Sequence, residues 1–186
     1  MTDESEAPAP RKYGKAARLF HWTTVVMVGI MIPVGITMTS GFFEGTGFQD
    51  PLFILHKGLG VVILALVVLR LGWRLFQKPP PFPDTMPPVE QWMAKTTHWG
   101  LYVLLLVQTV SGYLRTVAGN FPIEILEVVG IPPLLSEMPE LERAMLLVHT
   151  ASAYILTAAI AAHVSAAVYH AITENDGILR RIWPPV

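Results

Sequence analysis

The stretch His149–His163 reads HTASAYILTAAIAAH, lies in the last apolar segment of the sequence and is its most informative feature. A helix turns by about 100° per residue, so the two histidines return to within roughly 40° of the same face. At about 1.5 Å per residue, they lie roughly 21 Å apart along the helix axis. Because the apolar core of a bilayer is about 30 Å thick, one imidazole falls near each membrane surface.

The composition supports a membrane protein. Hydrophobic residues make up 52% of the 186 residues, and the mean hydropathy is +0.48, which is too high for an ordinary soluble domain. The apolar residues are gathered in long runs, a pattern typical of transmembrane helices. There are no cysteines, which excludes disulfides, thiolate metal sites and the covalent attachment of a c-type haem.

The sequence predicts an all-α membrane protein, a four-helix bundle that forms a single domain over residues 15–186. A polar, proline-containing segment over residues 1–14 is expected to be a mobile tail. The predicted spans are approximately 17–39, 52–76, 97–118 and 144–172. The connection 117–143 is rich in glutamate but includes two apolar pieces, which predict a short helix lying at the membrane surface.

The distribution of Lys and Arg predicts the orientation. Ten of the thirteen lie in the N-terminal segment, in the connection after the second span and at the C-terminal end. The opposite side keeps only Lys57, Arg115 and Arg143. Since cytoplasmic segments carry an excess of positive residues, both termini are expected to be cytoplasmic and the acidic third connection to lie outside.

Four histidines fall inside the spans at two depths. His56 and His149 lie near the outer surface, whereas His21 and His163 lie near the inner surface. Ionisable residues in membrane spans are costly, which favours a functional role over a simple hydrogen bond between helices. Facing helices of a bundle can supply both axial ligands of a cofactor. The depths therefore predict two stacked b haems, one held by each pair.

His98 and His170 also lie near the inner surface, and on depth alone either could replace a member of the inner pair. His163 is preferred because its spacing from His149 suits two stacked haems. His98 and His170 are then interfacial residues that could bond a propionate or a quinone carbonyl, or pass protons. Simple anchoring at the interface explains them equally well.

Two cations stand beside predicted ligands. Arg18 precedes His21 by three residues on roughly the same helical face, and Lys57 directly follows His56. Both are candidates to neutralise haem propionates. The two glycines in residues 58–60 could allow close approach of a porphyrin or a helix. Interfacial anchoring explains three other cations at least as well: Arg70, Arg74 and Arg115.

Segments around these residues resemble the bacterial cytochrome b561 family. They are RLFHW at 18–22, HKGLG at 56–60, LRLGWR at 69–74, HWGLY at 98–102, SGYL at 111–114 and HVSAAVYHAITENDGILRR at 163–181. They run in order through all four predicted spans, so the resemblance covers nearly the whole chain. It implies a multi-pass protein of the bacterial inner membrane with two b haems. By position, the implied ligands are His21, His56, His149 and His163.

Two axial imidazoles leave no open iron position, which favours electron transfer over oxygen binding. The resemblance implies an oxidoreductase that exchanges electrons with ubiquinone and, in some members, oxidises superoxide at the periplasmic face. One alternative is a cytochrome b subunit that anchors a periplasmic dehydrogenase or hydrogenase through the third connection and relays electrons to quinone. Another is a haem-free, histidine-lined metal or proton transporter. The expected partners are the lipid bilayer, quinone and a small periplasmic electron donor or acceptor, not nucleic acid.

Overall fold

The computed structural model describes residues 12–83, 86–174 and 176–183, and none of these residues forms a strand. The elements are α1 (Lys15–Thr39), α2 (Gln49–Phe76), α3 (Pro88–Ala118), α4 (Glu124–Val128), α5 (Pro139–Tyr169), a π-helical turn (His170–Glu174) and a 3-10 turn (Leu179–Arg181). Four helices are long and apolar enough to cross a membrane. The all-α prediction with four spans and a short helix in the third connection is confirmed. Most of the predicted tail, residues 1–14, lies outside the described residues.

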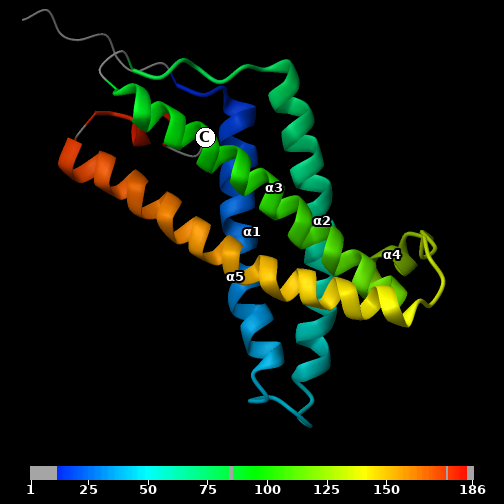
Figure 1. The fold of residues 1–186 in the computed structure, drawn as a ribbon. Coiled ribbons are helices and arrows are strands. Elements are labelled where there is room, and N and C mark those ends of the chain that lie inside the picture. Colours follow the sequence, from blue (N-terminus) through cyan, green and yellow to red (C-terminus); the bar gives the residue numbers. More distant parts are fainter. Residues whose placement is uncertain (1–11, 84–85, 175, 184–186) are drawn as a thin grey trace, which may run out of the picture.

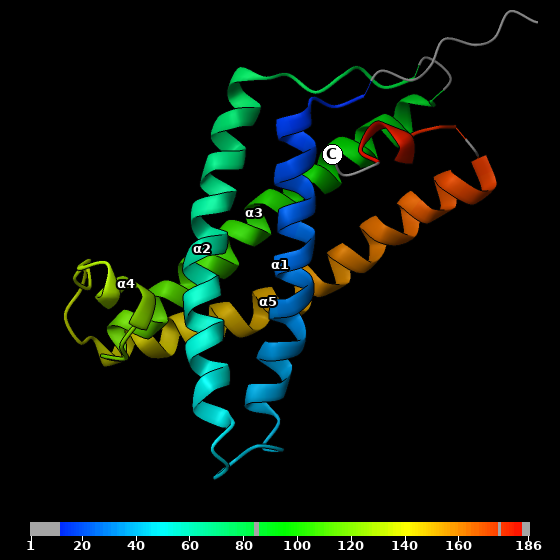
Figure 2. The same cartoon turned by 180° about the vertical axis from the view of Figure 1, so that it is seen from behind.

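The four long helices form two hairpins (Figure 1). α1 lies beside α2, and α3 lies beside α5, while the second hairpin crosses the first obliquely. The view from behind shows the same crossing (Figure 2). The start of α1, the connection between α2 and α3, and the C-terminal turn gather on one side of the protein. The fold therefore brings the positively charged segments of the chain to the same side.

Two helices begin earlier than their apolar runs predicted. α3 begins at Pro88 and not near residue 97, and α5 begins at Pro139 and not near residue 144. A proline fits the first helical turn because its missing N–H has no partner there and its φ is already helical. Glu90 and Glu140 in these first turns add favourable charges at the positive end of the helix dipole. Hydropathy alone does not detect such polar beginnings.

The buried core is an apolar layer where α2, α3 and α5 meet. It consists of Ile63, Val67, Leu105 and Leu156. Leu156 is midway along α5 between His149 and His163, so this apolar layer separates the two predicted sets of histidines. Many other apolar side chains face outward, such as Leu69 with 62% and Leu147 with 72% of its surface exposed. Outward apolar surface on long helices is what a lipid environment stabilises.

The C-terminal turn packs onto the side of the protein that carries the chain start. The buried guanidinium of Arg181 donates hydrogen bonds to the carbonyl oxygens of Pro80 and Pro81, at 2.9 and 2.6 Å. The backbone N–H of Tyr13 donates to the carbonyl of Arg181 at 3.0 Å. These contacts connect three segments distant in sequence, and they support the end of α1 on which His21 lies.

Candidate functional site

The histidines predicted to form the outer pair meet in the structure, and we call them the outer cluster. The ring centroids of His56 (α2) and His149 (α5) are 6.2 Å apart, with an angle of 82° between the ring planes. The two imidazoles therefore converge from facing helices, where they could together hold a haem.

Two glycines from the other helices make room for these imidazoles. A Cβ atom on Gly112 (α3) would lie 2.8 Å from Cε1 of His149, and one on Gly35 (α1) would lie 3.1 Å from Cε1 of His56. Both distances are shorter than ordinary van der Waals contact. All four long helices thus take part in the outer cluster: two supply an imidazole, and two supply a glycine that leaves room for it.

The polar surroundings of the two outer imidazoles differ. Nδ1 of His149 lies 2.9 Å from the carbonyl oxygen of Gln108. Nδ1 of His56 is buried and has no hydrogen-bond partner among the described residues, an arrangement that costs free energy unless another group binds the ring. Arg115 lies one turn beyond Gly112 on α3, and its Nε lies 3.8 Å from Oε1 of Glu142. A guanidinium at this place can compensate a carboxylate such as a propionate.

A second set of imidazoles, the inner cluster, lies beyond the apolar layer. The ring centroids of His163 (α5) and His98 (α3) are 5.5 Å apart. His21 (α1) lies within electrostatic reach of both. The structure therefore brings together the predicted pair, His21 and His163, and also the rival His98. Which two of the three serve as ligands stays a prediction.

Two arginines of α2 point into the inner cluster. Nη2 of Arg70 lies 3.1 Å from Nδ1 of His21, and its guanidinium carbon lies 5.1 Å from the ring centroid of the buried Tyr102. The guanidinium carbon of Arg74 lies 5.4 Å from the same ring centroid. Arg18, the predicted propionate partner, is half-buried on α1 one turn before His21. Arg70 thus lies directly beside an imidazole of the inner cluster, and Arg74 lies over the same Tyr102 ring as Arg70.

A family model for prokaryotic cytochrome b561 matches residues 12–185. The chain belongs to this family. Cytochrome b561 homolog 2 of Escherichia coli (strain K12) is 28% identical over 174 residues, which cover 93% of this chain and 92% of that protein. Membership implies a membrane cytochrome that binds b-type haem and transfers electrons. The two clusters are the places in this cytochrome where imidazoles converge from different helices.

Lys57 of this cytochrome binds the third connection. Its ammonium donates to Oε1 of Glu124 at 2.9 Å and to the carbonyl oxygen of Pro122 at 2.5 Å. Burial raises the pKa of Glu124, but the hydrogen bond and the charge of Lys57 lower it by more than burial raises it. The pKa of Glu124 therefore lies below its ordinary value. The contact fastens α4 to α2. A propionate role for Lys57 stays a prediction, since Glu124 is its partner in this structure.

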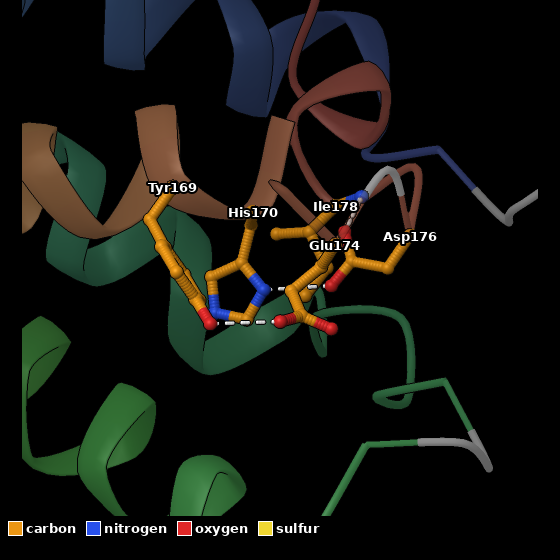
Figure 3. Close-up of polar contacts among 5 residues, drawn as sticks. All are labelled: Tyr169, His170, Glu174, Asp176 and Ile178. Carbon is orange, nitrogen blue, oxygen red and sulfur yellow. Dashed lines mark hydrogen bonds and ion pairs between the residues drawn. The ribbon is translucent and has the colours of Figure 1, made fainter. Parts of the chain in front are cut away.

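His170 lies at the end of α5, in the π-helical turn (Figure 3). Its Nδ1 lies 2.7 Å from Oδ2 of Asp176, and the other oxygen of Asp176 accepts a hydrogen bond from the N–H of Ile178. The neighbouring Tyr169 hydroxyl donates to Glu174 at 2.8 Å. A carboxylate facing Nδ1 orients the imidazole and leaves its Nε2 for another partner. This arrangement is compatible with the predicted proton or carbonyl chemistry of His170.

Several residues of the two clusters were not singled out by the sequence. Gly35, Gly112 and Gln108 contact or flank the outer imidazoles, whereas a Cβ on either of the predicted glycines in residues 58–60 would approach only Ile125 or Met31 on other elements, and no histidine. Two signals were available. Gln108 is an amide inside an otherwise apolar run, and polar residues in membrane spans are usually functional. Gly112 belongs to the SGYL segment that resembles the family.

Proposed function

We propose that this cytochrome holds two b haems, one in each cluster, and carries single electrons between the two sides of the bacterial inner membrane. The observation that carries the proposal is the 6.2 Å separation of the His56 and His149 rings, with His163 placed further along the same helix. When bound, each haem iron supplies reversible one-electron chemistry. The residues of the chain orient the imidazoles, exclude water and compensate charge.

For the inner haem we propose His21 and His163 as ligands. Their depth in the spans and their positions in the family-like segments support this assignment, and both rings lie in the inner cluster. Replacing each of His21, His98 and His163 by leucine tests it. The assignment requires that the first and third variants lose the inner haem and that the His98 variant keeps it. Loss in the His98 variant with retention in the His21 variant would reverse the assignment.

We further propose that ubiquinone exchanges electrons with the protein at the inner end. Reduction of a quinone consumes two electrons and two protons, so such a site needs proton-carrying groups beside the electron carrier. His98 in the inner cluster and the pair of His170 with Asp176 supply such groups there. Superoxide, a one-electron donor, is the proposed reductant at the outer end, where Arg115 is a nearby cation.

A single purified preparation tests these proposals in order. A red protein with two haems per chain and reducible b-type bands supports the two-haem proposal, whereas a colourless protein would favour the transporter alternative. Addition of superoxide should then reduce the haems, and a soluble ubiquinone analogue should reoxidise them. If neither superoxide nor quinol changes the haem spectrum, the proposed donor and acceptor are wrong.

The orientation of the chain is also a proposal, with both termini in the cytoplasm. Its support is that the cation-rich segments share one side of the fold. Reporter fusions after residue 186 and within the connection 119–138 test it. Cytoplasmic reporter activity at the first position and periplasmic activity at the second are expected. The opposite pattern would invert the assignment of both clusters.

A second candidate function is a relay subunit for a periplasmic enzyme. The observation that favours it is the exposed apolar surface of the third connection, where Val128 has 86% and Leu134 has 76% of its surface exposed. Such surface suits a protein partner or the lipid interface. Co-purification of a large dehydrogenase or hydrogenase in mild detergent would support the relay role. Full quinone-linked activity without any partner would contradict it.

A further inference from the structure

The segment that follows the C-terminal 3-10 turn is joined to α1 beside one of the inner histidines. The indole Nε1–H of Trp22 donates a hydrogen bond to the carbonyl oxygen of Ile182 at 3.1 Å. The ring centroids of Trp22 and Trp183 are 5.1 Å apart, with an angle of 75° between the ring planes. The ring centroid of Trp22 also lies 5.5 Å from that of His21. One indole thus connects the C-terminal turn to a proposed haem ligand.

Arg181 holds the C-terminal turn itself in place. Its guanidinium is buried, and Nη2 donates to the carbonyl oxygens of Pro80 and Pro81. Because Nη2 carries two N–H bonds, it can serve both acceptors at once. The proline rings restrict the backbone φ, so both acceptors belong to a stiff segment. Arg181 therefore attaches the turn to the connection between α2 and α3, and the turn in its place offers a carbonyl to Trp22.

Packing alone determines the rotation of α1 about its axis only weakly. Of its 25 residues, Thr24 and Met38 are the buried ones. In a bilayer an apolar side chain is as stable toward lipid as toward another helix, so apolar contact gives α1 little rotational preference. Successive residues of a helix are about 100° apart around the axis. A directed hydrogen bond at Trp22 therefore also determines the direction of the neighbouring His21.

We propose that Trp22 is the positioning residue of the inner haem site. Its hydrogen bond to the C-terminal turn, which Arg181 holds in place, sets the rotation of α1 and thereby the direction of the His21 imidazole. This inference rests on the proposed function, since it takes His21 as a ligand. None of these hydrogen bonds uses an imidazole nitrogen. Ligation of a haem by His21 therefore leaves all of their donors and acceptors available.

Two substitutions test the two ends of this connection, each with a matched control. Trp22→Phe keeps an aromatic ring and removes the Nε1–H donor. Its control is Trp92→Phe, because Trp92 is an exposed tryptophan at the start of α3. Arg181→Gln removes the buried guanidinium. Its control is Arg180→Gln, which removes the same charge from the neighbouring exposed residue, so the two variants differ in geometry and not in net charge.

The first readouts are retention of each haem against a competing haem-binding protein and the ferric electron paramagnetic resonance spectrum of the full-length protein. Trp22→Phe should bind the inner haem about two- to tenfold more weakly, the usual effect of one lost hydrogen bond, and should shift the inner low-spin signal. Arg181→Gln should act in the same direction, and Arg181→Lys, which keeps a charged donor, should restore part of the loss. The outer centre and both controls should match the wild type.

A further readout does not depend on haem. In Trp22→Phe the C-terminal turn should open more often, so trypsin should release the residues after Arg181 about two- to tenfold faster than in the wild type or in Trp92→Phe. This measurement tests the contact itself, whereas the haem readouts test what the contact does for His21.

Several results would overturn the inference. Wild-type retention and signals of the inner haem in both Trp22→Phe and Arg181→Gln would show that the turn positions nothing. Faster tryptic release with an unchanged inner centre would show that the contact holds the turn and not the ligand. Equal loss of both haems would indicate a general loss of stability. If Arg181→Gln fails to fold, Trp22→Phe decides alone. Absence of an inner haem from the wild type, or its retention in His21→Leu, would instead refute the proposed function.

Discussion

Gly112 is the glycine packed most tightly against an imidazole of the outer cluster, so its substitution is the sharpest test of how that imidazole is held. In Gly112→Ala the new Cβ would lie 2.8 Å from Cε1 and 3.0 Å from Nδ1 of His149. To reach ordinary contact at 3.4 Å, the ring or the helix must move by about 0.6 Å. Overpacking of this kind costs about 1–3 kcal/mol. If the cost falls on the haem-bound state, the outer haem should bind roughly 5- to 150-fold more weakly.

The assay is the haem-to-protein ratio during titration of the purified variant with a competing haem-binding protein, together with the low-spin signals of both centres. Loss of the outer haem at a lower competitor concentration, with an unchanged inner centre, is expected. Gly100→Ala is the matched control, since it lies on the same helix and a Cβ there would meet nothing within 4 Å. Equal haem retention in the two variants would refute the role of Gly112 in seating the imidazole.

Three further variants probe other contacts. Gly35→Ala places a Cβ 3.1 Å from the other outer imidazole, so a weaker loss of the outer haem is expected in the same competition assay. Arg70→Leu removes a cation beside His21, which should lower the midpoint potential of the inner centre by tens of millivolts in a redox titration and leave the outer centre unchanged. The lowered pKa of Glu124 means that its contact with Lys57 is complete above the ordinary carboxyl pKa and is lost as the pH falls through the folded value. The protection of the α4 amides from hydrogen exchange should therefore fall with acid in the wild type, by at most about 1 kcal/mol, and should not fall in Glu124→Gln. The same pH dependence in both proteins would contradict this prediction.

The depth of each residue along the membrane normal could be predicted because it depends on local properties of the sequence. Apolar runs determine which segments cross a membrane, and helical rise converts sequence position into depth. The same arithmetic placed His149 and His163 at two levels of one helix. It also paired His56 with His149, whose rings do meet. The early starts of α3 and α5 were missed because a polar helical turn with proline has no hydropathy signal.

The contacts between helices could not be predicted, because they depend on how each helix is rotated about its axis and on how the helices cross. Depth alone could not show that the rings of His98 and His163 lie only 5.5 Å apart. It could not show that Arg70 points inward and not toward the lipid headgroups. The ion pair of Lys57 with Glu124 joins residues that are 67 positions apart, which no periodicity connects.

An apolar layer separates the two proposed haem centres, and the distance across it limits how strongly the charges of one cluster act on the other. Its buried side chains are aliphatic, and the midpoint Leu156 is roughly 10 Å along the helix axis from each flanking histidine of α5. The energy of a charge pair falls with distance, so a cation within a cluster stabilises an added electron there more strongly than a cation beyond the layer does. Arg115 serves the outer cluster and Arg70 the inner one. Substitution of either arginine should therefore shift the potential of the proposed centre in its own cluster more than that of the other, and equal shifts of both potentials would contradict this reasoning.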